Sequence, residues 1–246
     1  KTLAEADGED FIVNGQKIWT TWAQHSQWIF VLVRTDPDAP RKQAGISFLL
    51  IDLATPGITV RPIRTITGDE EFAEVFFDDV RVPRTNLVGE VNDGWRVANS
   101  LLAHERLGTA NPMICYDALD RIRKIARATG MIEDRAFRDR LAEAELETVT
   151  LAALFSHAVT LTQVKGSLGV DSSIMKIAST EIMQRVVDLL VDAAGAHGAD
   201  ADPIETEDGS VDVATLLLQC RRATIYGGSS EIQRNIIAKR VLGLPS

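Results

Sequence analysis

The feature that most constrains the fold of this chain is a change in hydrophobic period near residue 90. Before it, apolar and polar residues alternate in short runs separated by proline and glycine, which is typical of β-strands. After it, apolar residues recur every three or four positions over long stretches, which indicates amphipathic helices. The 246 residues therefore predict two regions, 1–90 and 91–246, each long enough to bury a core.

The first region predicts a small sheet. Asn14-Gly15 is a dipeptide favoured in tight turns, so we expect the run over 11–19 to be a hairpin centred on it. Further strands are expected over 28–34, 45–53, 58–64 and 72–82. Short strands at this regular spacing favour a sheet that packs on itself as a barrel or sandwich.

The second region predicts a bundle of helices. Helical periodicity extends over 94–128, 134–164, 171–195 and 211–242. Pro112 is expected to kink the first of these helices or to lie in an early helical turn, and Gly227-Gly228 is expected to break the last. Residues 199–210, rich in Asp, Glu, Gly and Pro, are expected to form an exposed loop. Four helices joined by modest loops favour an up-down bundle.

Composition excludes several classes of function. The net charge of −9 argues against nucleic-acid binding, which needs a basic surface. Charged residues interrupt every apolar run before it reaches membrane-spanning length, and residues 1–10 lack the apolar core of a signal peptide. Cys115 and Cys220 have no metal-ligand spacing, so we expect two buried thiols and no metal site. These features predict a soluble, cytoplasmic protein without membrane or nucleic-acid partners.

Two short segments have both a functional and a structural interpretation. Gly227-Gly228 before Ser229 and Ser230 could offer backbone N–H groups to an anion or cofactor, or could be a helix corner capped by one of the serines. Trp19 beside Thr21 could hold a flat heterocycle, or could simply pack in the sheet. Local evidence alone favours the structural interpretation of both segments.

A third segment, His104-Glu105-Arg106, lies within an apolar stretch of the first helix. A carboxylate in such surroundings is either paired with a neighbouring cation, here Arg106, or poised as a base with a raised pKa.

Taken in order, three segments resemble the acyl-CoA dehydrogenase family. Residues 14–20 are similar to its flavin-packing strand, residues 72–95 to its exit from the middle β-domain, and residues 225–234 to its C-terminal signature. The resemblance implies an α+β fold: a partial antiparallel β-barrel over 1–90, followed by an up-down four-helix bundle over 91–246. It also implies that an N-terminal helical domain and the first β-segment lie outside this chain. We therefore expect a truncated enzyme that binds FAD weakly by itself.

The resemblance implies FAD as the cofactor and assigns residues to it. Trp19 and Thr21 match positions that pack on the isoalloxazine ring and hydrogen-bond near its N5. Ser229 and Glu231 match the turn that contacts the adenosine half, although many members have Gln at the position of Glu231.

A second set of cofactor contacts depends on assembly. Asp192 and Gly195 fall where relatives have a Gln-x-x-Gly-Gly stretch that reaches the FAD of a neighbouring subunit. The family forms dimers and dimers of dimers, so the resemblance implies a homodimer or homotetramer. The apolar content of 174–191 and 211–218, more than one bundle face needs, suggests that the bundle supplies the interface.

The catalytic base is implied by a departure from the commonest family pattern. Gly227 stands where many members have the catalytic glutamate, whereas Glu105, in a Glu-Arg-Leu string, matches a branch with the base on the first bundle helix. The resemblance therefore implies Glu105 as the base. It assigns Arg106, Gly227 and Gly228 to the substrate, with a backbone N–H after the Gly227 position hydrogen-bonding the thioester oxygen.

The implied reaction is the FAD-dependent α,β-dehydrogenation of an acyl-CoA thioester, an oxidoreductase activity in lipid metabolism. Flavin N5 would accept the hydride, and an electron-transfer flavoprotein would be the electron acceptor. Two alternatives remain open. One is a flavin oxidase or monooxygenase on the same fold, and the other is a non-catalytic subunit of a heteromeric dehydrogenase.

Overall fold

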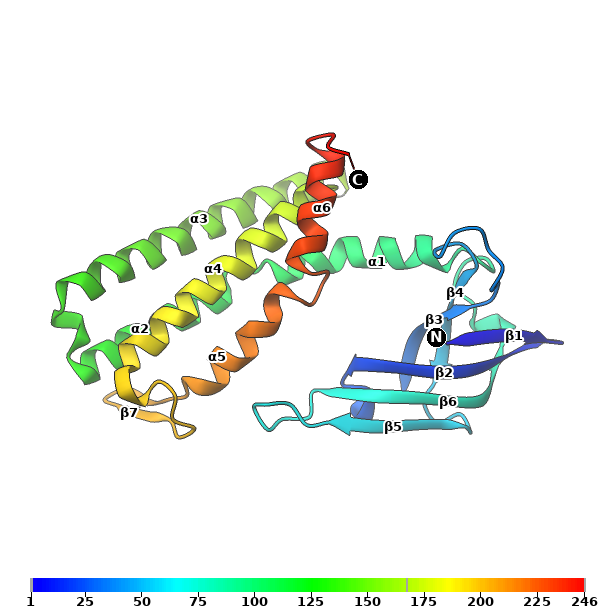
Figure 1. Cartoon of the computed structure of the whole chain (residues 1–246), viewed down its shortest axis with the longest axis horizontal. Helices are drawn as coiled ribbons and strands as arrows, with labels where there is room; N and C mark the ends of the chain where they lie inside the picture. The colour runs from blue at the N-terminus through cyan, green and yellow to red at the C-terminus, as the bar shows by residue number, and fades with distance from the viewer. Residues whose placement is uncertain (1, 167, 246) are drawn as a thin grey trace. The chain divides into compact units, whose positions relative to one another are not determined.

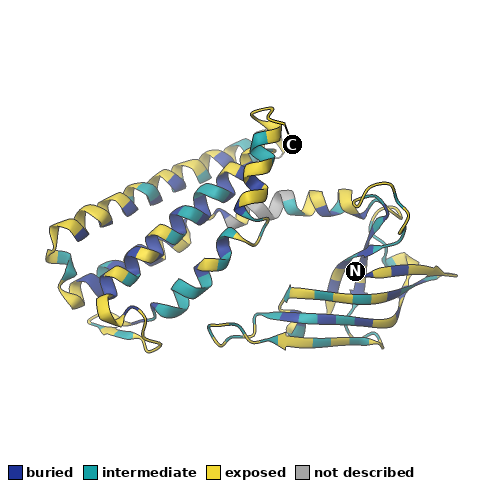
Figure 2. Ribbon diagram, in the orientation of Figure 1, coloured by how far each residue is buried: buried dark blue, intermediate teal, exposed yellow. Residues whose placement is uncertain are grey.

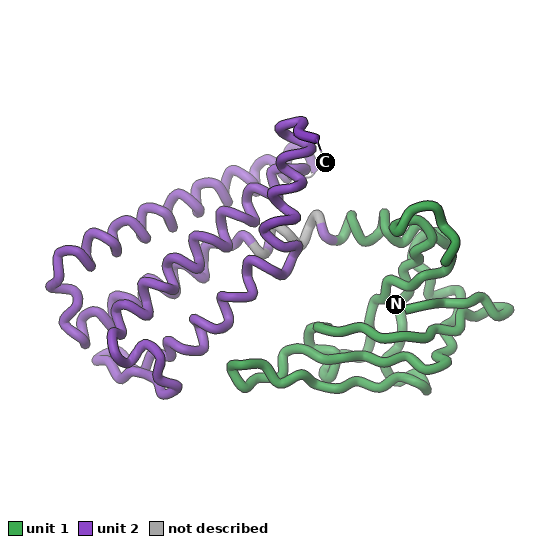
Figure 3. The backbone as a smooth tube through the Cα atoms, in the orientation of Figure 1, with its two compact units in different colours: residues 1–101 green, residues 102–246 purple. Residues whose placement is uncertain are grey.

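The computed structural model of this chain describes residues 2–166 and 168–245, with side chains described at all of these positions except 103–107 and 109. The chain divides into two compact units, residues 1–101 and 102–246, which Figure 3 draws in separate colours. The first unit is built on a β-sheet and the second is a bundle of helices (Figure 1). The chain therefore has the predicted α+β fold.

The sheet of the first unit has six strands in the order β4-β3-β1-β2-β6-β5. Their bounds are Leu3–Asp7 for β1, Asp10–Thr21 for β2, Trp28–Arg34 for β3, Ile46–Asp52 for β4, Ile58–Ile63 for β5 and Phe72–Pro83 for β6. Neighbouring strands run antiparallel except β1 and β3, which share one parallel pair, Leu3 with Arg34. Because β4 and β5 are the outer strands of an open sheet, the first unit is a partial barrel, as predicted.

Buried side chains alternate with more exposed ones along β3, where Ile29, Val31 and Val33 are buried (Figure 2). Burial of this apolar surface is what drives the sheet to pack. The core of the first unit includes Phe11, Val13, Val31, Leu49, Val75 and Val80.

Asn14-Gly15 lies inside strand β2, so the prediction of a hairpin turn there is wrong. The dipeptide sits at a bulge where β2 pairs with β6. The Asn14 side-chain amide donates to the Asp79 carboxylate (2.9 Å), and its carbonyl oxygen accepts from the Asp79 backbone N–H (2.9 Å). The tight turn instead follows β1, where Asp7 pairs with Asp10 and Gly8 has a φ of 59°.

Among the described residues, helices α2 to α6 lie in the second unit, and α1 begins in the first. The helices are α1 (Gly94–Thr109), α2 (Met113–Thr129), α3 (Arg135–Lys165), α4 (Asp171–Ala194), α5 (Ala214–Arg221) and α6 (Ser230–Arg240). Pro112 immediately precedes α2 as its N-cap. The predicted 94–128 stretch is therefore two helices, and the proline lies at the start of the second, as the early-turn alternative expected. Asp134 caps α3 by accepting a hydrogen bond from the Phe137 backbone N–H (2.7 Å).

Helix α4 is the centre of the bundle, because α2, α3, α5 and α6 all pack against it. It is buried on several sides (Figure 2), and among its fully buried apolar residues are Val186, Val187 and Leu190. The high apolar content of 174–191 therefore serves the core of this unit. An amphipathic helix with one buried face would not need it.

The segment predicted as an exposed loop, 199–210, instead contains part of a small hairpin. Strands β7 (Ile204–Thr206) and β8 (Gly209–Val211) pair antiparallel. Val211 is buried in the bundle core and Ile204 packs against it, which fixes the hairpin to the helices. Apart from the half-buried Ile204 and Thr206, residues 199–210 are exposed, as predicted. The two strands were not predicted, because strands of three residues are too short to show a period in the sequence.

Three features of the described residues bear on function class. Cys115 and Cys220 are both free and buried, as predicted. In this part of the chain, no group of three or more His, Cys, Asp or Glu side chains could hold a metal ion. None of its helices combines the length and hydrophobicity that crossing a lipid bilayer requires.

Candidate active site

The sequence-predicted cofactor residues of the first unit lie at the end of strand β2. Lys17 pairs with Val75 and Thr20 with Ala73, so Ile18 and Trp19 together face a single residue of β6. This is a β-bulge, a feature that re-aims side chains at the ends of sheets and beside active sites.

The bulge holds Trp19 in an unusual conformation. Its φ is 63°, in the left-handed region, which costs a bulky L-residue roughly 1–2 kcal/mol. The indole is nevertheless 60% exposed and touches Phe72 edge-on, with ring centroids 5.9 Å apart. Thr21 is two residues further along the strand and is also exposed. A strained backbone that presents an aromatic ring to solvent points to a binding role rather than to packing.

The predicted residues of the second unit lie at the start of α6. Gly227 and Gly228 have φ values of 63° and 88°, so the chain makes a turn of two successive left-handed residues just before the helix. Ser229 is the N-cap, and its Oγ accepts a hydrogen bond from the Ile232 backbone N–H (3.4 Å). The capping interpretation of this serine is therefore confirmed.

Glu231 gives the start of α6 a negative charge. A hydrogen bond from the Ser229 hydroxyl, together with the Glu231 backbone N–H, holds the pKa of this carboxyl below its usual value. An ionised carboxylate in the first turn also interacts favourably with the helix dipole. The group can accept hydrogen bonds from hydroxyl or amino donors, but its charge opposes a phosphate at the same place.

Asp192 and Gly195 lie at the far end of α4. Gly195, with a φ of 57°, ends the helix, and its N–H donates to the carbonyl of Asp192. The Asp192 carboxylate accepts a hydrogen bond from Arg140 of α3, and both side chains are about half exposed. Glu105 and Arg106 lie outside the residues whose side chains the structure describes, so their roles stay predictions.

Two buried polar residues in the second unit were missed in the sequence. Gln233 of α6 and Lys176 of α4 are both fully buried, and Lys176 Nζ has no hydrogen-bond partner among the described residues. Burial lowers the pKa of the Lys176 ammonium group. The available signal was a polar residue at a position where helical periodicity calls for an apolar one.

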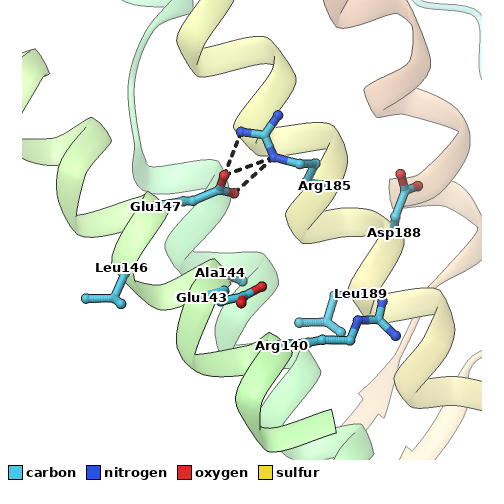
Figure 4. Close-up of a pocket in the computed structure, with 8 residues that line it drawn as sticks. All are labelled: Arg140, Glu143, Ala144, Leu146, Glu147, Arg185, Asp188 and Leu189. Carbon is cyan, nitrogen blue, oxygen red and sulfur yellow. Dashed lines mark hydrogen bonds and ion pairs between the residues drawn. The ribbon is translucent and has the colours of Figure 1, made fainter. Parts of the chain in front are cut away.

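A surface groove of about 490 Å³ between α3 and α4 holds none of the predicted site residues (Figure 4). Its lining combines charged side chains with Ala144, Leu146 and Leu189, and Arg185 and Glu147 form a two-pronged ion pair with a shortest distance of 2.8 Å. Side chains already paired with one another offer little to a ligand, so we do not place the active site there.

Comparison with known proteins matches both units. Residues 1–80 match the family description "Acyl-CoA dehydrogenase, middle domain", and residues 92–242 match "Acyl-CoA dehydrogenase, C-terminal domain". Acyl-CoA dehydrogenase IpdE1 of Mycobacterium tuberculosis is 42% identical over 251 residues, which cover 99% of this chain and 62% of that protein.

Solved structures give the same result. The "Tcur3481-Tcur3483 steroid ACAD" superposes with a TM-score of 0.90 at 29% identity, covering 100% of this chain and 64% of that one. The ChsE4-ChsE5 complex from Mycobacterium tuberculosis has a TM-score of 0.85 at 30% identity, covering 100% and 65%. The chain thus spans less than two thirds of the length of each of these three relatives.

Proposed function

Because this chain belongs to the acyl-CoA dehydrogenase family, we propose that it serves the FAD-dependent α,β-dehydrogenation of an acyl-CoA thioester to the trans-2-enoyl-CoA. The observation that carries the proposal is the combination of Gly227 with Glu105. A chain that lacks the glutamate of the C-terminal signature keeps one on the first bundle helix. An inactive relative would have no reason to retain that residue.

The donors and surfaces present suit FAD. Trp19 offers an exposed aromatic face to the flat isoalloxazine, and Thr21 offers a hydroxyl beside it. At the start of α6, Ser229 and the ionised Glu231 suit the hydroxyl and amino groups of adenosine better than they suit a pyrophosphate. This supports the assignment of the two surfaces to the two halves of the cofactor.

Each of the proposed site residues would have its own role in the reaction. Glu105 removes the proton from the α-carbon, while Arg106, Gly227 and Gly228 contact the substrate. A backbone N–H of the Gly227–Gly228 turn donates to the thioester oxygen and stabilises the negative charge that develops there. The chemistry that FAD would supply when bound is acceptance of a hydride, so the two hydrogens would leave the substrate as a proton taken by Glu105 and a hydride from the β-carbon.

The proposal extends to assembly and electron transfer. In a homodimer or homotetramer, Asp192 and Gly195 would lie against the FAD of a neighbouring subunit. Exposure of about half of the Asp192 side chain leaves it accessible to such a neighbour. An electron-transfer flavoprotein would reoxidise the enzyme.

A second candidate function is that of a subunit in a heteromeric dehydrogenase. It is favoured by the names of the two solved relatives, each of which pairs two different chains. If the protein purified by itself reduces bound flavin with an acyl-CoA, it contains its own catalytic base. If it does so only after a second chain is added, the heteromeric function is correct.

The test is the variant Glu105→Gln, which keeps size and hydrogen bonding but removes the base. We expect the rate of anaerobic flavin bleaching by an acyl-CoA to fall about a hundred- to ten-thousand-fold, with FAD still bound. Glu143→Gln, the same change on the exposed face of α3, is the control and should bleach at the wild-type rate. Equal rates for Glu105→Gln and wild type would reduce Glu105 to an ion-pair partner of Arg106.

A further inference from the structure

The buried side chain of Gln233 hydrogen-bonds the glycine turn that precedes α6. Gln233 lies in the first two turns of α6, and its own backbone N–H donates to the Ser229 carbonyl (3.0 Å) in the helical pattern. Its side-chain Nε2 reaches back and donates to two successive carbonyls, those of Gly227 (3.2 Å) and Gly228 (3.3 Å). Gln233 is fully buried.

The fit between this amide and the turn is close. A Cβ added to Gly228 would stand 2.5 Å from Gln233 Nε2, which is nearer than real Cβ contacts come. The backbone at Gly228, with φ at 88°, is also one that other L-residues rarely adopt. The conformation of the turn favours glycine at position 228, and a side chain there would also displace the Gln233 amide.

Two consecutive glycines have more backbone freedom than any other pair of residues. Left to itself, such a turn would sample many orientations of its N–H groups. A hydrogen-bond donor that stabilises a developing charge must instead be fixed in advance, because a displacement of about 1 Å can reduce a rate roughly a hundredfold. Something must therefore hold this turn, and Gln233 is the side chain that bonds both of its carbonyls.

We propose that Gln233 is a positioning residue, which fixes the Gly227–Gly228 turn so that a backbone N–H of that turn points at the substrate thioester oxygen. The inference rests on the proposed function, which places the thioester at this turn. Gln233 itself does not touch the substrate. It accepts no proton and acts only through the two glycine carbonyls.

The variant Gln233→Met tests this role with little change in shape. It removes both hydrogen bonds, and it also removes Gln233 Oε1, a buried oxygen without a hydrogen-bond partner among the described residues. The folded state therefore loses two modest bonds and is relieved of one unsatisfied group, so the variant should remain folded. Ser230→Ala is the matched control, because it deletes a buried hydroxyl one turn away that also lacks a described partner.

The measurements use the intact, flavin-loaded enzyme, because this chain by itself is expected to bind FAD weakly. In Gln233→Met we expect kcat for flavin reduction to fall about ten- to a hundredfold, with KM changed less than threefold. Ser230→Ala should keep the wild-type kcat. In a Glu105→Gln background, which prevents turnover, the infrared carbonyl band of a bound ¹³C-labelled acyl-CoA thioester should shift toward its frequency in solution when Gln233→Met is added. That shift reports a weaker hydrogen bond to the thioester oxygen, which a merely structural residue would not change.

A folded Gln233→Met enzyme with wild-type kcat and an unmoved carbonyl band would overturn the inference. Should this variant not fold, Gln233→Glu keeps the shape and replaces the donor by a carboxyl group, which can donate only when protonated. Its kcat relative to wild type should then recover as pH falls, and a constant ratio would equally overturn the inference. A wild-type enzyme that no acyl-CoA reduces would instead contradict the proposed function.

Discussion

The guanidinium of Arg140 on α3 donates a hydrogen bond to the carboxylate of Asp192 on α4, and the two side chains form an ion pair on the surface of the bundle. The partners are 52 positions apart in the sequence. A residue that the family resemblance assigns to a neighbouring subunit's cofactor thus has a partner within its own bundle.

We expect this ion pair to contribute little to the stability of the isolated subunit. Its side chains are 53% and 47% exposed, and water screens charges at that exposure. A double-mutant cycle with Arg140→Gln and Asp192→Asn, measured by urea unfolding, should give a coupling energy of about 0.2–1 kcal/mol that shrinks with added salt. The two-pronged Arg185–Glu147 pair is the comparison and should couple more strongly. A salt-independent coupling well above 1 kcal/mol would contradict this.

Two glycines of helix α1 should respond in opposite ways to the same substitution. A Cβ at Gly94 would lie 2.4 Å from the Ser47 carbonyl carbon and 2.5 Å from the Phe48 nitrogen, both of them backbone atoms of β4. Gly94→Ala should therefore destabilise the first unit by about 1–3 kcal/mol, as overpacking does. Among the described atoms, a Cβ at Gly108 meets nothing within 4 Å, so Gly108→Ala should stabilise the helix by about 0.5–1 kcal/mol. Thermal unfolding of the two variants checks the pair, and equal shifts of Tm would be inconsistent with this packing.

The buried ammonium of Lys176 should make the stability of the bundle depend on pH. Burial lowers its pKa below the ordinary 10.5, and the charges of Glu231 and Glu181 only partly oppose this. The unfolded chain therefore binds the proton more tightly than the folded one does. The unfavourable contribution is fully present below the folded pKa, and it disappears as pH rises from that pKa to 10.5.

Lys176→Met should accordingly raise the free energy of unfolding near pH 7 by roughly 1–3 kcal/mol, because it removes a buried group without a described partner. The advantage over wild type should shrink as pH rises toward 10.5. Ser173→Ala, one turn earlier on α4, removes a buried polar group that carries no charge, and its effect should not change with pH. A Lys176→Met variant less stable than wild type at pH 7 would indicate that the ammonium has a favourable partner.

The sequence predicted those features that depend on neighbouring residues. Strand β3, Trp-Ile-Phe-Val-Leu-Val-Arg, has the bounds that its run of apolar residues indicates. Strand β1, Leu-Ala-Glu-Ala-Asp, has no such run and forms because β2 and β3 lie on either side of it. Asn14-Gly15 carries a strong local turn signal, but its pairing with Asp79, 65 residues away, overrides that preference.

In the candidate site too, features set by neighbouring residues can be predicted, and features set by distant contacts cannot. The glycine turn and the Ser229 cap can be predicted because the signal lies within four residues. The strained φ of Trp19 depends on a bulge against β6, and the contact of Gln233 with both glycines depends on how α6 packs. Neither can be inferred from local sequence, because each needs a partner that only the folded chain supplies.

The central position of α4 also determines how the second unit unfolds. Each of α2, α3, α5 and α6 covers a part of α4, so the departure of any one of them would bring water onto the apolar side chains of the helix they share. A partly opened bundle would then lose much of its buried surface for only a modest gain in chain entropy. We therefore expect opening to be close to all-or-none, with the backbone amide protons around Val186 and Leu190 the last to exchange with solvent.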